Sequence, residues 1–482
     1  MTTLTSFEQA EASADRDRIR EALADAKREP FWFDDHPRQD RPRALEGDLS
    51  TDLLVVGGGF SGLWTALKAK ERKPDREVVL IEAETVGWAA SGRNGGFCEP
   101  SLTHGRANAA RHLPGEESMH SDMGVENLEG LLADLERYGI DCDIDAHGVI
   151  KLATEEHQEE SLRALAASEA DVELLTGQDL QDQVRTAAAS TGAWAKADGV
   201  VLNPAKLVLG LLDACRRAGV RVFENTRVDA LKEEPAAGSI LATTGRGRIT
   251  AKQVVLATNG FSPLVRRQRL RTVPVYDYAV VTEPLSAAQE EEIGWKKRQG
   301  LTDLNNRFHY LRKIVDSEGR TRILIGGYDA LYHYGRAVRP ELEVSEPTFE
   351  RLAVHLGVFF PSLSGVKFTH AWGGMIDTCS RFFAFFALSH HGRVAYASGF
   401  TGLGVAATRF AADAMLDLLE GADTRRTRSR MVRTVPMPFP PEPFAWAAIT
   451  FTASQMARSD RRGGKRGLWL SVLDRLKLGF DS

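Results

Sequence analysis

Residues 53–62 constrain the fold more than any other segment of the chain. An apolar run ends there in a glycine turn, and helix-forming residues follow. Gly57, Gly59 and Gly62 occupy the glycine positions of a G-x-G-x-x-G pattern, and a second apolar run ends at Glu82. Strand, turn, helix, strand and acid in this order predict a βαβ unit of the Rossmann type, which binds a dinucleotide. An ordinary strand–turn–helix is the alternative.

Each residue type in this turn has a physical role in the prediction. Gly57 permits the tight turn, Gly59 lets the backbone approach a pyrophosphate, and Gly62 lets the helix pack closely on the strand. Phe60 and Ser61 begin the helix, whose unpaired N–H groups point toward phosphates. The acid 20 residues after the last glycine is placed to accept hydrogen bonds from a ribose diol. The motif does not distinguish NAD from FAD.

Length and composition are those of a globular protein with several domains. The 482 residues are too many for one simple core, so two or three domains are expected. Hydrophobic residues make up 43% of the chain and charged residues 26%, which is ordinary. The net charge of −5 does not indicate a nucleic-acid partner. The four cysteines lack C-x-x-C spacing, so neither a disulfide framework nor a metal site is predicted.

The two ends of the chain differ in charge. The N-terminus is polar and acidic without the apolar segment of a signal peptide, and no apolar run is long enough to span a bilayer, so we expect a cytoplasmic protein. Residues 421–482 contain 12 Lys/Arg and 5 Asp/Glu, a net charge of +7. This basic tail could dock on the acidic remainder of the chain, on a second subunit or on an anionic surface.

The pattern of side chains also changes along the chain. Residues 1–30 predict a polar helix, followed by an aromatic anchor at 31–33. Residues 271–371 are rich in aromatic residues and arginine and alternate in polarity, which predicts a separate β-rich domain. A strand at 394–398 then meets a second glycine turn, 399–404, and a helix follows.

Four patches of sequence, far apart in the chain, carry a resemblance to a known family. They are the first glycine turn with Glu82, the Ala-Ser-Gly-Arg-Asn-Gly-Gly run at 90–96, the segment 257–260, and Trp-Gly-Gly at 372–374 followed by the second glycine turn. Together they resemble the FAD-dependent D-amino-acid oxidase (DAO) family. The nearest branch is that of the amine oxidases near γ-glutamylputrescine oxidase, with sarcosine and glycine oxidases as relatives.

The resemblance implies a non-covalently bound FAD. In this family the second glycine turn and the dipole of the following helix face the flavin edge that becomes negative on reduction. The sarcosine-type relatives attach the flavin through a cysteine, and the matching position here is Gly374. The implied cofactor-binding residues are Gly57, Gly59, Phe60, Ser61, Gly62, Glu82, Ser91, Gly92, Arg93, Asn94, Gly95, Gly96, Val228, Thr258, Gly374, Gly399, Gly402, Leu403 and Gly404.

The implied fold is α/β. A Rossmann-type FAD-binding domain, similar to that of glutathione reductase, is interleaved with a β-rich α+β substrate domain, and a C-terminal helical tail follows. The expected parts are 1–50 (N-terminal helix and aromatic anchor), 51–105, 200–270 and 372–420 (discontinuous FAD-binding domain), 106–199 and 271–371 (substrate domain), and 421–482 (basic, proline-linked helical tail).

The implied reaction is oxidation of a primary or secondary amine, such as an amino acid or a polyamine-like molecule. Hydride passes to flavin N5, water hydrolyses the imine, and O2 is the expected acceptor. An apolar, aromatic pocket would favour the neutral amine by desolvation. Tyr328 and His309 are the leading candidates for its walls, with a structural aromatic residue on a sheet as the alternative for each. The relatives' carboxylate-binding lysine corresponds to Ala406, which disfavours an α-carboxylate at that spot.

Two other functions stay open at this point. The first is a flavin-dependent amine or amino-acid dehydrogenase that passes electrons to a quinone or an electron-transfer protein. The basic tail favours it, because a basic run precedes an amphipathic pattern from Leu468 to Leu476 that is typical of helices lying on anionic membranes. Packing of that helix on the body of the protein or in a homo-oligomer is the alternative. The second is a non-catalytic flavin-binding partner protein.

Overall fold

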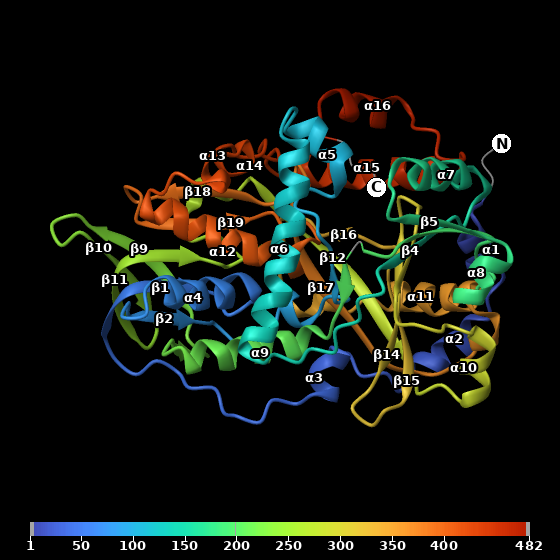
Figure 1. Cartoon of the computed structure of the whole chain (residues 1–482), viewed down its shortest axis with the longest axis horizontal. Helices are drawn as coiled ribbons and strands as arrows, with labels where there is room; N and C mark the ends of the chain where they lie inside the picture. Colours follow the sequence, from blue (N-terminus) through green and yellow to red (C-terminus); the bar gives the residue numbers. More distant parts are fainter. Residues whose placement is uncertain (1–3, 198, 479–482) are drawn as a thin grey trace.

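Two large β-sheets organise the chain. The structure is a computed structural model that describes residues 4–197 and 199–478. Figure 1 shows the two sheets side by side, one around β1 and β11 and the other around β12, β14 and β17. Segments from the whole length of the chain contribute to both sheets, so the two halves of the fold are interleaved.

The first sheet has eight strands and a parallel centre. Its central strand, β1, pairs in parallel with β2 and β11, and the strand order is β18-β19-β11-β1-β2-β8, with the hairpin β9–β10 beside β11. The central strands read as continuous apolar runs because both faces of a parallel sheet are covered. The strands are β1 (Leu49–Val56), β2 (Val78–Ile81), β8 (Arg221–Phe223), β9 (Val228–Glu234), β10 (Ser239–Thr244), β11 (Gly247–Leu256), β18 (Phe385–Ser389) and β19 (Val394–Ser398).

Helices cover one face of this sheet and enclose the largest apolar cluster. α4 packs against α9 and α12, and α6 packs against α12. The N-terminus of α9 follows from its sequence, because the Asn203 side chain accepts hydrogen bonds from the N–H groups of Ala205 and Lys206, and Pro204 takes the first position. The helices are α4 (Phe60–Arg72), α5 (Gly105–His112), α6 (Glu117–Tyr138), α9 (Pro204–Arg217) and α12 (Gly404–Glu420).

The second sheet has nine strands and is mainly antiparallel. Its order is β16-β12-β15-β14-β13-β4-β6-β5, with β17 paired along the other side of β12. The strands are β4 (Val149–Leu152), β5 (Val172–Thr176), β6 (Thr191–Ala195), β12 (Thr272–Thr282), β13 (Gly300–Asp303), β14 (His309–Val315), β15 (Thr321–Gly327), β16 (Leu331–Tyr332) and β17 (Phe368–Cys379). A short ribbon joins β3 (Phe97–Cys98) and β7 (Val200–Val201) between the two sheets.

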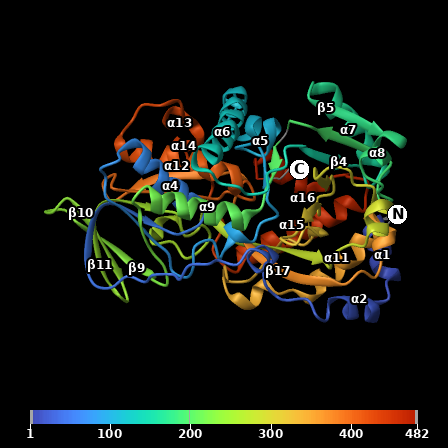
Figure 2. The same cartoon turned by 60° about the horizontal axis from the view of Figure 1, so that its bottom comes forward.

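Helices α1 and α11 cover this second sheet, with α2 packed on α11 (Figure 2). The single polar helix predicted for the N-terminus is instead two helices, because Asp15 caps a new one after an extended break. The predicted aromatic anchor forms a third helix and is buried at Phe31 and Trp32. The remaining helices here are α1 (Ser6–Ser13), α2 (Arg16–Leu23), α3 (Phe31–Asp35), α7 (Glu159–Ser168), α8 (Gln178–Gln183), α10 (Ala287–Ile293) and α11 (Glu346–Phe359).

Two of the expected boundaries do not match the strand and helix packing. The boundary at 372 falls inside β17, which pairs along its length with β12 of the second sheet, so the return to the first sheet comes only at β18. Helix α6 belongs by sequence to the expected substrate segment 106–199, but it contributes Leu128, Leu131 and Leu135 to the core under the first sheet. The Trp-Gly-Gly segment is thus built into the second sheet, and the Trp372 indole donates a hydrogen bond of 2.9 Å to the carbonyl of Arg93.

The C-terminal tail is helical. It comprises α13 (Arg425–Arg428), α14 (Arg430–Arg433), α15 (Phe444–Asp460) and α16 (Leu468–Arg475), drawn in red in Figure 1. A proline-rich stretch connects α14 to α15, which contacts β16 at the edge of the second sheet. Within the described ranges, no helix combines the length and the apolar character needed to cross a membrane.

Candidate functional site

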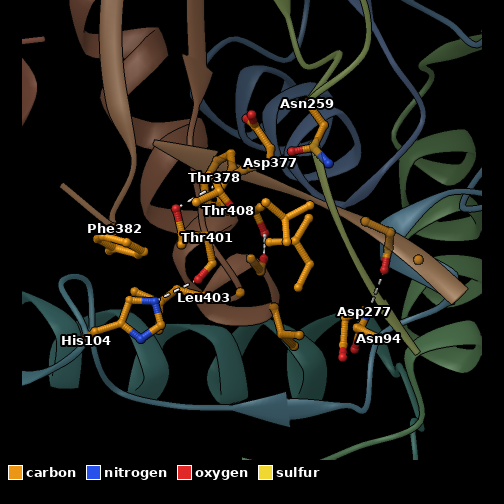
Figure 3. A pocket seen from close by; sticks show the side chains of 18 of the residues that line it. Asn94, His104, Asn259, Asp277, Asp377, Thr378, Phe382, Thr401, Leu403 and Thr408 are labelled. Atoms are coloured by element: carbon orange, nitrogen blue, oxygen red, sulfur yellow. Dashed lines mark hydrogen bonds between the residues drawn. The ribbon is translucent and has the colours of Figure 1, made fainter. Parts of the chain in front are cut away.

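A continuous cavity of about 2520 Å³ is lined by residues of both sheets. It brings together the four distant patches singled out from the sequence, and part of it is seen in Figure 3. Sixteen of the 19 residues expected to bind the cofactor line it. They are Gly57, Gly59, Phe60, Ser61, Glu82, Ser91, Arg93, Asn94, Gly95, Gly96, Val228, Thr258, Gly374, Gly402, Leu403 and Gly404.

The three other expected cofactor residues lie outside the cavity lining and serve packing. A Cβ on Gly62 would lie 1.9 Å from the carbonyl oxygen of Gly57, so this glycine lets the helix lie against the turn. A Cβ on Gly92 would lie 2.2 Å from the ring of Phe33. Gly399, at φ +78°, leaves room for the side chain of Cys379.

The first glycine turn is closed by contacts from three segments. Gly57 adopts φ +112°, and a Cβ there would lie 2.4 Å from the carbonyl oxygen of Ala257. A Cβ on Gly59 would lie 2.8 Å from the Ser91 hydroxyl, which also accepts a hydrogen bond of 2.9 Å from the Phe60 N–H. A Cβ at position 59 would therefore force the Ser91 hydroxyl to move, in addition to occupying space beside the proposed pyrophosphate.

Glu82 ends β2 inside the cavity. Its carboxylate accepts hydrogen bonds from the N–H of Gly58 at 2.6 Å and of Glu84 at 2.9 Å, and from the Trp88 indole at 3.1 Å. Burial raises the pKa of this carboxyl above its usual value. Because a carboxylate has about four acceptor positions, these three donors leave capacity for a ribose hydroxyl.

The second glycine turn delivers a helix N-terminus to the cavity. Gly402, Leu403 and Gly404 line the cavity at the start of α12. A Cβ on Gly402 or Gly404 would meet nothing closer than 3.9 Å, so both glycines border open space. The unpaired N–H groups and the positive end of the helix dipole make this position suited to a partly negative group.

Asp377 lies beside this turn with one oxygen unsatisfied. Its Oδ2 accepts a hydrogen bond of 2.5 Å from the Gly399 N–H, and its backbone oxygen accepts one of 3.0 Å from the Thr401 N–H. Asp377 and Thr401 are labelled in Figure 3. Its Oδ1 is buried and has no partner among the described residues, and the same holds for the Ser61 hydroxyl at the start of α4. Burial raises the pKa of Asp377 to about 6. Both orphaned oxygens belong to cavity-lining residues, as expected beside a polar ligand.

The Arg93–Gly96 run forms the wall between the two glycine turns. Arg93 donates hydrogen bonds to the carbonyls of Trp88 and Gly373 and pairs with Glu343 at 2.9 Å. The Asn94 side chain accepts a bond of 2.8 Å from the Gly96 N–H. We expected the glycines of this run to let the backbone approach the flavin. Their immediate reason is inside the protein, because a Cβ on Gly95 would lie 2.7 Å from the Tyr310 ring.

These features fit FAD. Two glycine turns, a buried acid after β2 and a helix N-terminus about one cavity match the pyrophosphate, ribose and ring edge of that cofactor. All four cysteines are buried, and none of the four is among the residues that line the cavity. When bound, FAD supplies a two-electron acceptor for a hydride.

An acid that the sequence analysis did not select lies on the second-sheet side of the cavity. Asp277 of β12 is paired in register with Gly374 of β17, and its Oδ2 accepts a hydrogen bond of 2.8 Å from the Tyr310 hydroxyl. Asp277 and Asn94 both line the cavity and are labelled in Figure 3. Burial raises the pKa of Asp277 to about 6. A signal was present in the alternation of β12, because Val273, Val275, Asp277 and Ala279 all line the cavity.

The two predicted pocket residues lie elsewhere, so that prediction is wrong in its geometry. His309 is fully buried, with Nδ1 2.6 Å from Asp303 Oδ2 and Nε2 2.9 Å from Nδ1 of His355. Tyr328 stacks on His309 at 5.0 Å and carries the Arg307 guanidinium over its ring at 3.7 Å. Neither lines the cavity, because both side chains face the core beneath α1 and α11. The alternative, structural aromatic residues on a sheet, describes both.

Ala406, which was expected to lie where the relatives bind a substrate carboxylate, does not face the cavity. Ala406 is buried in α12, and its carbonyl accepts a hydrogen bond from the Asn127 amide. It is not among the cavity-lining residues, whereas Val405 and Thr408 are. The exchange of a lysine for alanine at this position therefore carries no argument about how a substrate carboxylate is bound here.

Comparisons with known proteins agree with the assignment of the cavity to FAD. The family described as DAO, FAD dependent oxidoreductase, matches residues 52–418. The γ-glutamylputrescine oxidoreductase of Escherichia coli K12 is 30% identical over 388 residues, which cover 78% of this chain and 85% of that protein. The glycine oxidase of Geobacillus kaustophilus is 26% identical over 309 residues, covering 61% of this chain and 78% of its own.

Solved structures extend the likeness of fold. The crystal structure of the Geobacillus kaustophilus glycine oxidase superimposes with a TM-score of 0.63 at 19% identity, over 80% of this chain and 99% of that one. NikD, titled an unusual amino acid oxidase, gives a TM-score of 0.64 at 16% identity, over 82% and 99% of the two chains. With the matched family covering most of the sequence, the chain belongs to the DAO family of FAD-dependent oxidoreductases.

Proposed function

We propose that this oxidoreductase oxidises an amine to an imine, with the substrate nitrogen bound at Asp277. The observation that carries the proposal is a half-buried carboxylate of the second sheet that lines the same cavity as the first-sheet glycine turns and has a raised pKa. A carboxylate withdrawn from solvent is costly unless partners compensate it, and within the described residues no cationic side chain pairs with Asp277, whose side-chain partner is the Tyr310 hydroxyl. A substrate ammonium is the complementary partner.

The protonation state of Asp277 suits this role. With a pKa of about 6, the group is mostly a carboxylate at neutral pH and can attract an ammonium. Its raised pKa also makes it a better proton acceptor than an ordinary aspartate, because general bases work best near the operating pH. Asp277 would thus hold the amine and take up the proton that must leave before hydride is removed from the neighbouring carbon.

The electron acceptor divides two versions of the proposal. We favour O2, as in the relatives named oxidases, with non-covalent FAD held by the cavity-lining residues of the first sheet. A dehydrogenase that delivers electrons to a quinone or an electron-transfer protein is the second candidate. It is favoured by one observation, since half of the 16 exposed large hydrophobic side chains described lie between Val435 and Leu476 of the basic tail. That surface would also suit a homo-oligomer contact.

Replacement of the acid tests the proposal. Asp277→Asn should retain FAD and lower kcat/KM for the best amine by about 10²–10⁴-fold, the usual range for loss of a general base. Asp229→Asn is the matched control, because Asp229 also lines the cavity but is solvent-exposed beside Val228. It should change kcat/KM less than about twofold. An Asp277→Asn variant with wild-type kinetics contradicts the proposal.

A further inference from the structure

We infer that helices α15 and α16 form the far wall of the substrate cavity and select amines that carry an uncharged, apolar chain. This inference rests on the proposed function and adds the substrate class to it. The two helices lie after residue 418, where the family match ends, so their contribution belongs to this chain's own tail.

One face of α15 is turned into the cavity. The lining residues on this helix are spaced by three, four and seven positions, which places them along a single side. Helix α16 and the residues after it add to the same wall, and the Trp469 indole donates a hydrogen bond of 2.9 Å to the Thr452 hydroxyl. The wall consists of Ala445, Ala448, Ile449, Thr452, Ala453, Met456, Trp469, Leu473, Leu476 and Leu478.

The distal end of α15 is fixed to the rim of the cavity. The Asp460 carboxylate accepts hydrogen bonds of 3.0 and 2.6 Å from the backbone and side-chain nitrogens of Asn306. The next residue, Arg461, pairs with Glu8 of α1 at 2.7 Å. Because Asn306 and Phe308 themselves line the cavity, these bonds hold the tail directly against the loop between β13 and β14.

The proximal end is held as well. The Phe439 N–H donates a hydrogen bond of 2.7 Å to the carbonyl of Leu270, and the Ser380 hydroxyl donates one of 2.8 Å to the carbonyl of Met437. Tyr332 of β16 donates to the Glu442 carboxylate just before α15. Since β16 pairs with β12, this anchor places the helix beside the strand that carries Asp277. Anchors at both ends make the tail a fixed wall.

The chemistry of the two walls differs. No residue of the tail wall is charged, whereas the sheet wall carries Asp277. An amine with an apolar chain can place its ammonium at the acid and its chain against Ile449, Met456 and Leu473. Against these three side chains, a second ammonium or a carboxylate would instead lose its hydration without a partner on the tail wall, since the charged lining residues Lys151, Glu169 and Asp171 belong to other segments. Monoamines with long alkyl or aryl-alkyl chains are therefore the inferred substrates.

A charge placed on the wall tests the inference. We would measure kcat/KM for flavin reduction by n-alkylamines of four to eight carbons and by the α,ω-diamines of equal length. The wild type should prefer each monoamine at least about tenfold, increasingly with chain length. Ile449→Asp should reduce the preference at eight carbons about tenfold or more through KM, with kcat little changed. Val472→Asp, on the exposed face of α16, is the control and should behave as wild type.

Folding controls and contrary results complete this experiment on the apolar tail wall. FAD content and melting temperature report on folding, and Met456→Gln is a milder variant that should lower the same preference if Ile449→Asp does not fold. A wild type that prefers diamines, or an Ile449→Asp variant that behaves as Val472→Asp, overturns the inference while leaving the proposed function intact. If no amine reduces the flavin, the proposed function fails. The wall is then judged by octylamine binding through the flavin spectrum, and equal affinity in wild type and Ile449→Asp overturns it.

Discussion

The two sides of the cavity are built in different ways. The first-sheet side consists mainly of backbone. Its first glycine turn, Gly57–Gly62, is set against neighbouring carbonyls and side chains, and Gly402 and Gly404 of the second turn border open space. The second-sheet and tail side consists of side chains, among them Asp277 and Ile449, on a strand and a helix. The first turn permits little variation, because a Cβ added at Gly57, Gly59 or Gly62 would lie within 2.8 Å of a neighbouring atom. Side-chain surfaces can change composition without moving the main chain, so we expect affinity for FAD on one side and choice of substrate on the other.

The largest expected effect lies on the backbone side. Gly62→Val should abolish FAD binding and destabilise the fold by about 3 kcal/mol or more, because its Cβ would lie 1.9 Å from the Gly57 carbonyl oxygen. Gly404→Ala should keep the fold, since its Cβ meets only open cavity, yet weaken FAD binding. Bound flavin per protein and urea unfolding measure the two effects. Equal FAD affinity in Gly404→Ala and wild type would place the cofactor away from α12.

The backbone side was also the side that sequence could predict. A glycine that must pack against a carbonyl leaves a fixed spacing in the chain, and Gly57, Gly59 and Gly62 carry that spacing locally. Sixteen expected residues consequently line one cavity. Some of these glycines are explained by a protein neighbour and not by the cofactor. A Cβ on Gly95, for example, would collide with the Tyr310 ring.

The side-chain wall could not be predicted in the same way. Tyr328 and Asp277 both lie in or beside strands of one sheet, and which side of that sheet faces the cavity depends on where α1 and α11 pack. Tyr328 faces those helices, while Asp277 faces the cavity. The alternation of β12 gave the two faces but not their assignment. The expected domain boundary at residue 372 falls inside β17 for a similar reason. The pairing of β17 with β12 is a long-range contact that local sequence does not reveal.

The next effect concerns pH. If Asp277 accepts the substrate proton, kcat/KM for flavin reduction should rise about tenfold per pH unit below an apparent pKa of about 6 and level off above it. Tyr310→Phe removes the hydroxyl hydrogen bond that favours the carboxylate, so the midpoint should move to higher pH. A midpoint unchanged by this substitution would assign the titration to another group.

Stability should respond to pH through the same residue. The pKa of Asp277 is raised in the folded state, so the folded protein loses stability as pH rises from about 4 to about 6, and the loss persists above that range. Asp277→Asn removes this loss, and its melting temperature should exceed that of the wild type at pH 8 but not at pH 4. A variant that is equally destabilised at both pH values would show that Asp277 is structural.

The smallest expected effect is at the residue first predicted to be in the pocket. Tyr328→Phe should change kcat/KM by less than about threefold, because the side chain stacks on His309 outside the cavity. Steady-state kinetics with the best amine provide the measurement, and Asp277→Asn provides the contrast in the same assay. A hundredfold loss of kcat/KM in Tyr328→Phe would show that this tyrosine contributes to the substrate site. The assignment of substrate choice to the walls of the cavity would then be wrong.

The most direct test of the account is anaerobic titration of the FAD-loaded protein with a panel of amines, followed through the flavin absorption spectrum. We expect amines to bleach the flavin to its reduced form, an alkyl monoamine to do so fastest, and Asp277→Asn to slow the bleaching about a hundredfold or more without releasing FAD. A flavin that stays oxidised with every amine would contradict the proposed amine oxidation. Reduction of the flavin by the best amine at the wild-type rate in Asp277→Asn would contradict the role of Asp277.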